Sequence, residues 1–262
     1  MQSEYPNILA FMHLYKCGGT TFNWALQNAF PSRVLYCENK DSSGSRIDIE
    51  KFISYTSLDS LKKYSAVSSH LIDYKCLSEF SVVTTILRDP LSRLVSAYNF
   101  DFYRSMFTGT FDQYIDIYVN MMSKALGSEF INLLSSSDSR CALFLEDLDL
   151  SIIYLESMIK LYGYDVNLAF PSLRLNISKG KVPQAVSKHV LTDDQKKRFR
   201  FLNRDDIDLY RQQSEFFKAT LPKLCGDIDS SRREFSTRKL LADEKMSLIK
   251  SYGQGPAHFV YI

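Results

Sequence analysis

The residues best suited to hold an anion form one short segment near the start of the chain, HLYKCGGTT at 13–21. An apolar run precedes it and a helical pattern follows it. Glycines let the backbone turn tightly and bring N–H groups close to phosphate oxygens, and a helix N-terminus adds partial positive charge. The segment therefore predicts a phosphate-binding loop. Its expected donors are the Lys16 ammonium, the Thr20 and Thr21 hydroxyls, and the backbone of Cys17, Gly18 and Gly19.

The order of residues in this loop separates it from a Walker A loop, which needs a lysine after its last glycine, in GK[ST]. Here Lys16 precedes the glycine pair, and no hydroxyl follows the lysine directly to hold Mg²⁺. This order argues against nucleoside triphosphate chemistry and predicts a donor handled without a metal. The alternative, from the short string alone, is a Gly-Gly turn beside a solvated lysine.

A second candidate anion site lies in TTILRDPLSRLVSAY at 84–98. Arg88 falls at the end of a predicted strand, and Ser96 follows eight residues later, two turns into a predicted helix. An arginine with a hydroxyl is a good grip for a phosphate. Arg93 is expected to point elsewhere, toward a structural carboxylate. The alternative is that Arg88 pairs with an acidic helix end.

The elements that must position these residues alternate between strand and helix. Short apolar or β-branched runs predict strands at 8–14, 65–69 and 81–87. Helical patterns follow at 20–29, from Pro90 with Asp89 as its cap, over most of 111–164 with one short strand near 151–154, from Thr192, and at 204–218. We therefore expect an α/β fold with a central parallel sheet flanked by helices, a helix-rich C-terminal half, and ligands at the carboxyl ends of the strands.

Composition limits the remaining possibilities. The 262 residues suit one large domain, with a nucleotide-binding core at about 6–220 and a charged C-terminal extension at about 226–262. The net charge of +2 gives no general attraction to nucleic acid. Five dispersed cysteines without a CxxC pattern indicate reduced thiols and argue against zinc. The N-terminal residues lack the basic and apolar parts of a signal peptide or membrane anchor, so a cytoplasmic location without a transmembrane segment is expected.

Taken in order, these motifs resemble the PAPS-dependent sulfotransferases, in particular the Golgi carbohydrate type and its bacterial relatives (PAPS is 3′-phosphoadenosine 5′-phosphosulfate). HLYKCGGTTF is similar to the family's H-x-P-K-[TC]-G-G-T-[ST], and TTILRDPLSRLVSAY to its L-R-[DN]-P-x-x-R-x-x-S-x-Y. Weaker likenesses are Ser69-His70-Leu71 to a G-H-x segment, 120–127 to N-x-[MQ]…L-[SG]-G, and 202–210 to a late N-x-x-D-x-x-[LF]-Y helix. Two departures are Tyr15 in place of proline and Ser69 in place of glycine.

The resemblance implies a single P-loop-like sulfotransferase domain. Its first motif would bind the 5′-phosphosulfate of PAPS, and its second, with Arg88 and Ser96, would bind the 3′-phosphate. A late loop at 176–183, with Ser178 and Lys179, would close over the nucleotide. Lys16 would stabilise the leaving group, the product would be 3′,5′-ADP, and no metal would take part.

A base must remove the proton of the acceptor hydroxyl, and His70 is the first candidate because it follows a predicted central strand and imidazole titrates near neutral pH. The alternative is a buried histidine with a structural role. Glu38 and Asp73 are rival bases, since some related enzymes use a carboxylate. His13 is expected to be structural, and Cys17, although a helix N-terminus lowers a thiol pKa, is expected to contribute only its backbone N–H.

Three function classes follow from these residues. The first is an O-sulfotransferase acting on a glycan, a lipid-linked sugar or a small alcohol. The second is a kinase-like phosphotransferase, which the missing GK[ST] disfavours, and the third is a nucleotide-binding protein without turnover. The regions 100–140 and 227–262 are expected to shape the acceptor site, but nothing in them identifies the acceptor, and the oligomeric state stays open.

Overall fold

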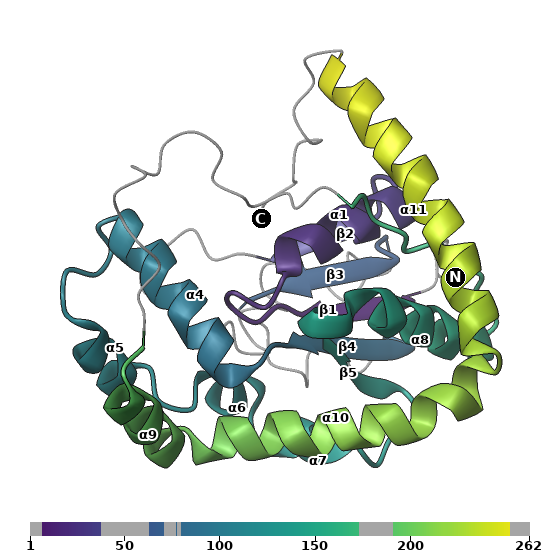
Figure 1. The fold of residues 1–262 in the computed structure, drawn as a ribbon. Helices are drawn as coiled ribbons and strands as arrows, with labels where there is room; N and C mark the ends of the chain where they lie inside the picture. The colour runs from purple at the N-terminus through teal and green to yellow at the C-terminus, as the bar shows by residue number, and fades with distance from the viewer. Residues whose placement is uncertain (1–6, 38–62, 71–76, 78–79, 173–190, 252–262) are drawn as a thin grey trace.

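A computed structural model of the chain describes residues 7–37, 63–70, 77, 80–172 and 191–251 (Figure 1). Its centre is a five-stranded sheet in the order β2-β3-β1-β4-β5, with every neighbouring pair parallel. The strands are β1 (Leu9–Met12), β2 (Val34–Cys37), β3 (Ala66–Ser69), β4 (Val82–Leu87) and β5 (Arg140–Phe144). Every residue of β1, β3 and β4 is buried, as expected for inner strands that helices cover. The predicted α/β fold with a central parallel sheet is confirmed.

Helices surround the sheet and make up most of the chain after β5. They are α1 (Gly19–Ala29), α4 (Pro90–Tyr103), α5 (Phe111–Ile117), α6 (Met121–Leu126), α7 (Ser128–Leu133), α8 (Leu148–Leu161), α9 (Asp193–Leu202), α10 (Arg204–Cys225) and α11 (Ile228–Ser251), with a short 3₁₀ turn, η2 (Leu145–Asp147). Figure 1 shows α10 running along the lower side of the view and α11 along its right side. The helix-rich C-terminal half is confirmed.

Two helix starts follow from capping chemistry that the sequence carries. Pro90 is the first residue of α4, and the Asp89 carboxylate accepts the Ser92 N–H at 2.8 Å. Thr192 caps α9 and exchanges hydrogen bonds with Gln195 in a capping box. Both helices therefore begin where the sequence predicts.

The predicted strand near 151–154 is wrong, because these residues lie inside α8 and the last strand among the described residues is 140–144. All four residues are buried, since α8 packs against β5, α10 and α11. A helix buried on most sides loses its amphipathic period, so its apolar run looks like a buried strand. The strand β2 was not predicted.

The register of the sheet explains how the site is assembled. Met12 lies opposite both Ser69 and Thr85, so β1, β3 and β4 reach the same edge of the sheet. The segments that follow these three strands carry Lys16, His70 and Arg88. Residues 57 and 72 positions apart therefore meet at the carboxyl edge, as the bonds between His70 and His13 and between Arg88 and Lys16 show. Open α/β sheets bind ligands at this edge.

The charged C-terminal segment folds back as α11 onto the same core. Its Phe235 and Met246 are buried, and α11 packs against α8. Lys239 donates to Asp149 at 2.8 Å, and Arg238 pairs with Glu156 at 2.7 Å. The extension therefore contributes to the packing of the domain.

Candidate active site

The predicted phosphate loop joins β1 to α1, and its backbone conformation depends on the residues at positions 16, 18 and 19. Lys16 and Gly18 have positive φ values of 64° and 88°. A side chain on Gly19 would overlap the His13 ring, and one on Gly18 would meet Leu145 at 2.5 Å. Within the described residues the N–H groups of Gly18 and Gly19 make no hydrogen bond. The loop therefore offers backbone donors at a helix N-terminus, which is the usual arrangement for binding an anion.

Lys16 and Arg88 meet at this loop. The Arg88 Nη1 donates to the Lys16 carbonyl oxygen at 3.2 Å, and the Lys16 ammonium lies 4.0 Å from the centre of the Phe100 ring. Burial, followed by the charge of Arg88, lowers the pKa of Lys16. Arg88 forms no ion pair with any described residue, so its expected alternative, pairing with an acidic helix end, is not seen there. The two predicted anion sites thus share one electropositive edge.

The remaining nucleotide-binding candidates fall around this edge. Thr20 is exposed and Thr21 half-buried in the first turn of α1, and Ser96 is half-buried in α4. Cys17 is buried beneath the loop, and burial raises the pKa of its thiol to about 12. The expectation that the helix N-terminus lowers this pKa is therefore wrong, because desolvation of the thiolate dominates, while a role limited to the backbone is consistent with the burial.

His70 lies beside His13 at the end of β3. The two ring centres are 3.7 Å apart, and the His70 Nδ1 donates to the His13 carbonyl oxygen at 2.7 Å. This bond fixes the neutral tautomer with its lone pair on Nε2. Although part of the ring is exposed, desolvation lowers the pKa of His70, and the bond to His13 opposes this only partly. The geometry therefore presents a neutral imidazole at the ligand edge.

His13 supports the loop from below, as expected for a structural residue. Its ring stacks on Phe11, with centres 5.3 Å apart, and occupies the space that a Gly19 side chain would need. Burial, followed by the neighbouring His70, lowers the pKa of His13 well below 6.5. His13 is therefore neutral at pH 7.

A hydrogen-bonded group that the sequence did not predict fixes the other side of the loop. The buried Asp101 carboxylate accepts the Tyr15 hydroxyl and the Tyr114 hydroxyl, each at 2.5 Å. Tyr15 stands where the family pattern has proline, and it ties the residue before Lys16 to α4 and α5. The only signal for this group in the sequence is that departure.

The two weaker motifs at 120–127 and 202–210 are hydrogen-bonded to each other. The Asn203 side chain accepts the Asn120 N–H at 2.8 Å, and the buried Asp206 carboxylate accepts the N–H groups of Met122 and Ser123 at 3.0 and 2.7 Å. Asp206 therefore caps the N-terminus of α6 from α10. These residues hold α6 against α10.

Comparison with protein families agrees with the motifs. The model described as the sulfotransferase family matches residues 5–214, which is most of the chain and includes the loop, Arg88 and His70. The chain belongs to the sulfotransferase family. Its general activity is transfer of a sulfuryl group. No curated protein matches this sulfotransferase.

Several predictions for this sulfotransferase lie outside the described residues, namely the roles of Ser178, Lys179, Glu38 and Asp73. In the described part, no helix is both long and apolar enough to cross a membrane, and His, Cys, Asp and Glu residues form no cluster of three that could hold a metal. The cytoplasmic location stays a prediction.

The surroundings of Arg93 differ from those that the sequence predicts. It was expected to reach a structural carboxylate, but within the described residues its guanidinium forms no ion pair and its Nε has no hydrogen-bond partner. Its side chain is only 2% exposed. Arg93 lies in the first turn of α4, and its side chain is turned inward, where it lines a cavity together with Leu14 and Tyr15.

Proposed function

We propose that this chain is a PAPS-dependent O-sulfotransferase, and that its acceptor is the hydroxyl of a carbohydrate or another alcohol. The observation that carries the proposal is the hydrogen bond from Arg88 to the Lys16 carbonyl, which joins the two anion sites. A donor with phosphate at both its 3′ and 5′ positions needs two cationic sites of this kind. The unused N–H groups of the loop and the space kept clear at Gly19 fit the 5′ end of such a donor.

When bound, the donor supplies the sulfuryl group and departs as 3′,5′-ADP. His70 Nε2 takes the proton of the acceptor hydroxyl while the acceptor oxygen bonds to sulfur. Lys16 places its charge beside the oxygen whose bond to sulfur breaks, and the loop N–H groups stabilise the same developing charge. His13 and Asp101 act indirectly, because they hold the loop and His70 in place.

Thermal shift with 3′,5′-ADP, 5′-AMP, ATP and ATP with Mg²⁺ tests the nucleotide site. Preferential stabilisation by 3′,5′-ADP is expected, since a ligand that binds the native state raises its melting temperature. A preference for ATP with Mg²⁺ would instead indicate a phosphotransferase. Labelled PAPS with a panel of glycan, lipid and phenol acceptors then tests transfer; nucleotide binding without any sulfated product would indicate a binding protein.

A further inference from the structure

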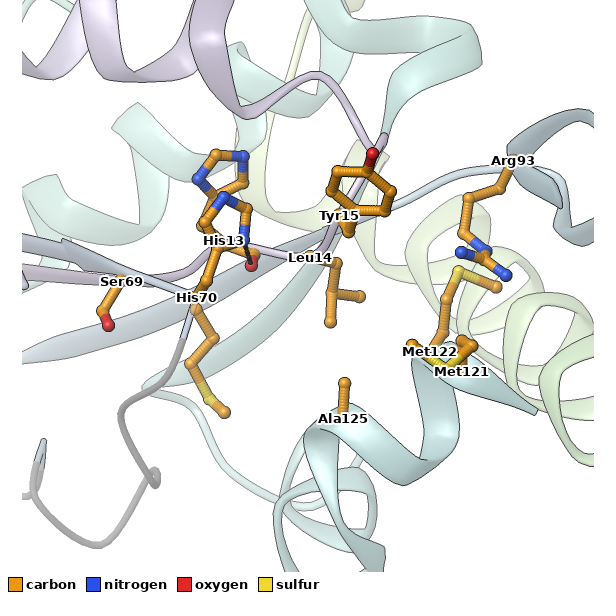
Figure 2. A pocket seen from close by; sticks show the side chains of 10 residues that line it. His13, Leu14, Tyr15, Ser69, His70, Arg93, Met121, Met122 and Ala125 are labelled. Atoms are coloured by element: carbon orange, nitrogen blue, oxygen red, sulfur yellow. Dashed lines mark hydrogen bonds between the residues drawn. The ribbon is translucent and has the colours of Figure 1, made fainter. Parts of the chain in front are cut away.

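A cavity of about 260 Å³ opens at the carboxyl edge of the sheet beside His70. Figure 2 shows His13 and His70 on one side of it, Arg93 on the other, and Leu14 and Tyr15 between them. The rest of its wall consists of the polar Ser69, next to His70, and of the apolar Met12, Met121, Met122 and Ala125. The cavity therefore has a polar group at each end and an apolar middle.

Arg93 is the unusual member of this wall. Its side chain is 2% exposed, yet within the described part of the chain its guanidinium has no carboxylate partner and its Nε no hydrogen bond. Arg238, whose buried Nε likewise makes no hydrogen bond within the described residues, pairs with Glu156 through two bonds of 2.7 Å. A buried cation without a partner is strongly unfavourable, so a residue of this kind indicates a missing anion.

Asp206 of α10, whose carboxylate holds the start of α6, forms no ion pair with Arg93 and is engaged elsewhere. Asp206 already accepts three hydrogen bonds at the start of α6, from the N–H groups of Met122 and Ser123 and from the Ser123 hydroxyl. It therefore stabilises the helix that forms the floor of the cavity. The charge of Arg93 is left for a group that enters the cavity itself.

The opposite end of the cavity suits a hydroxyl. His70 is neutral with its lone pair on Nε2, and the His13 Nδ1 is buried without a hydrogen-bond partner in the described residues. Methionine side chains in the middle are flexible and adapt to apolar groups of different shape. The volume is slightly below the range of about 300–1,000 Å³ for sites that enclose a drug-sized ligand, so the cavity fits one portion of an acceptor.

We propose that this cavity is the acceptor subsite, and that the acceptor is an amphipathic hydroxy acid whose anionic group pairs with Arg93 while its hydroxyl reaches His70. The apolar body of the acceptor would lie over Leu14, Met122 and Ala125. This inference rests on the proposed function for the role of His70, but the binding of an apolar anion at Arg93 can be measured without turnover.

The test uses three probes of equal chain length, hexanoate, 1-hexanol and hexylamine, with the full-length protein and no nucleotide. Isothermal titration and thermal shift should show hexanoate binding at least about tenfold more tightly than 1-hexanol, because of the charge-assisted bond, and no binding of hexylamine. Equal binding of all three probes would overturn the proposal.

Arg93→Met should weaken hexanoate binding by at least about tenfold and bring it to the level of 1-hexanol. The matched control is Arg211→Met, which removes the same charge from the exposed face of α10, where Arg211 pairs with Asp208, and should leave the preference intact. Ala125→Phe fills the cavity and keeps the cation, so it should abolish hexanoate binding. Ala125→Phe also tests the proposal if Arg93→Met does not fold, because a preference for hexanoate over 1-hexanol that is retained in Ala125→Phe would contradict the proposal.

Turnover separates this inference from the proposed function. With labelled PAPS, 6-hydroxyhexanoate should be a better acceptor than 1-hexanol in the wild type, and the two should become equal in Arg93→Met. If hexanoate binding depends on Arg93 but no transfer is detected, the proposed subsite is supported and the proposed sulfotransferase activity is contradicted. If sulfuryl groups are transferred to alcohols with no preference for the hydroxy acid, the proposed activity is supported and the proposed subsite is contradicted.

Discussion

Lys16 illustrates how single residues of the loop are prepared for an anion. Its positive φ turns the chain toward the helix N-terminus, and its ammonium rests against Phe100 beside the Arg88 charge. Desolvation and a second cation both make a lone positive charge less favourable there, so an anionic donor gains more from binding than it would at an open surface.

Lys16→Ala should lower kcat by about 10²-fold or more and weaken 3′,5′-ADP binding far less, because the ammonium matters most as negative charge develops on the leaving oxygen. Initial rates and titration of 3′,5′-ADP measure the two effects. Lys160→Ala, which changes an exposed lysine of α8, serves as the control. An unchanged kcat in Lys16→Ala would remove the residue from the mechanism.

Arg88 should set the preference for 3′-phosphorylated nucleotides. Arg88→Ala should bring the affinity for 3′,5′-ADP down to that for 5′-AMP, since a charge-assisted contact to the 3′-phosphate is lost. Arg140→Ala is the control, because Arg140 begins β5 at the opposite edge of the sheet. If the wild type already binds both nucleotides equally, Arg88 has been given the wrong role.

The pH dependence tests His70. Its pKa is lowered from 6.5, so the neutral base is lost only as the pH falls below that value. The value of kcat/KM should therefore be level above pH 6.5 and fall at lower pH through one titrating group. His70→Gln should remove that limb and most of the activity while 3′,5′-ADP affinity is kept. An intact acidic limb in the variant would turn attention to Glu38 and Asp73.

At the scale of elements, the loop depends on how α4 and α5 hold Asp101. One carboxylate accepts two phenol hydroxyls, so Tyr15 from the loop and Tyr114 from α5 share a single buried acceptor. Burial, followed by the bond to Asp101, raises the pKa of both phenols, which stay protonated as donors. The proline of the family pattern would restrict the loop backbone by itself. In this chain the hydrogen bond from Tyr15 to Asp101 restricts it instead.

Tyr15→Phe should lower the free energy of unfolding by about 1.5–3 kcal/mol, the range for a hydrogen bond to a charged group. Tyr114→Phe should cost a similar amount. The double variant should cost more than the sum, because Asp101 then keeps a buried charge without either donor. Tyr118→Phe is the control, since the Tyr118 ring packs against Tyr114, with ring centres 4.2 Å apart, and its hydroxyl makes no hydrogen bond to Asp101. Urea unfolding measures all four, and strict additivity would contradict a shared acceptor.

At the scale of the whole molecule, local signals predicted more than long-range ones did. The glycine pair, Lys16 and the Asp89-Pro90 helix start are visible in a few consecutive residues, and the structure places them as expected. The apposition of His13 and His70 needs the register of β1 and β3, and the cavity that Arg93 lines needs α6 in place. No window of sequence contains those contacts.

Long-range packing also explains why the sequence predicted a strand near 151–154 and only a charged extension at about 226–262. α8 is buried because β5, α10 and α11 all pack against it, and α11 supplies Phe235 to the core. Glu156 of α8 joins these parts, since it accepts the Leu168 N–H at 2.7 Å and two bonds from Arg238 of α11. The C-terminal helix is therefore expected to support the stability of the nucleotide-binding half.

Arg238→Met tests that coupling. It should lower the free energy of unfolding by about 1–3 kcal/mol, below the roughly 3–5 kcal/mol of a fully buried pair, because the Arg238 side chain keeps 22% exposure. Arg232→Met, on the same helix, removes a pair with Asp147 that is 3.7 Å long and half exposed, and should cost at most about 1 kcal/mol. Both variants should keep wild-type affinity for 3′,5′-ADP, since neither residue lies at the loop. Equal losses in the two variants, measured by urea unfolding, would show that the Glu156 pair is no stronger than a surface contact and that α11 is held by its apolar residues alone.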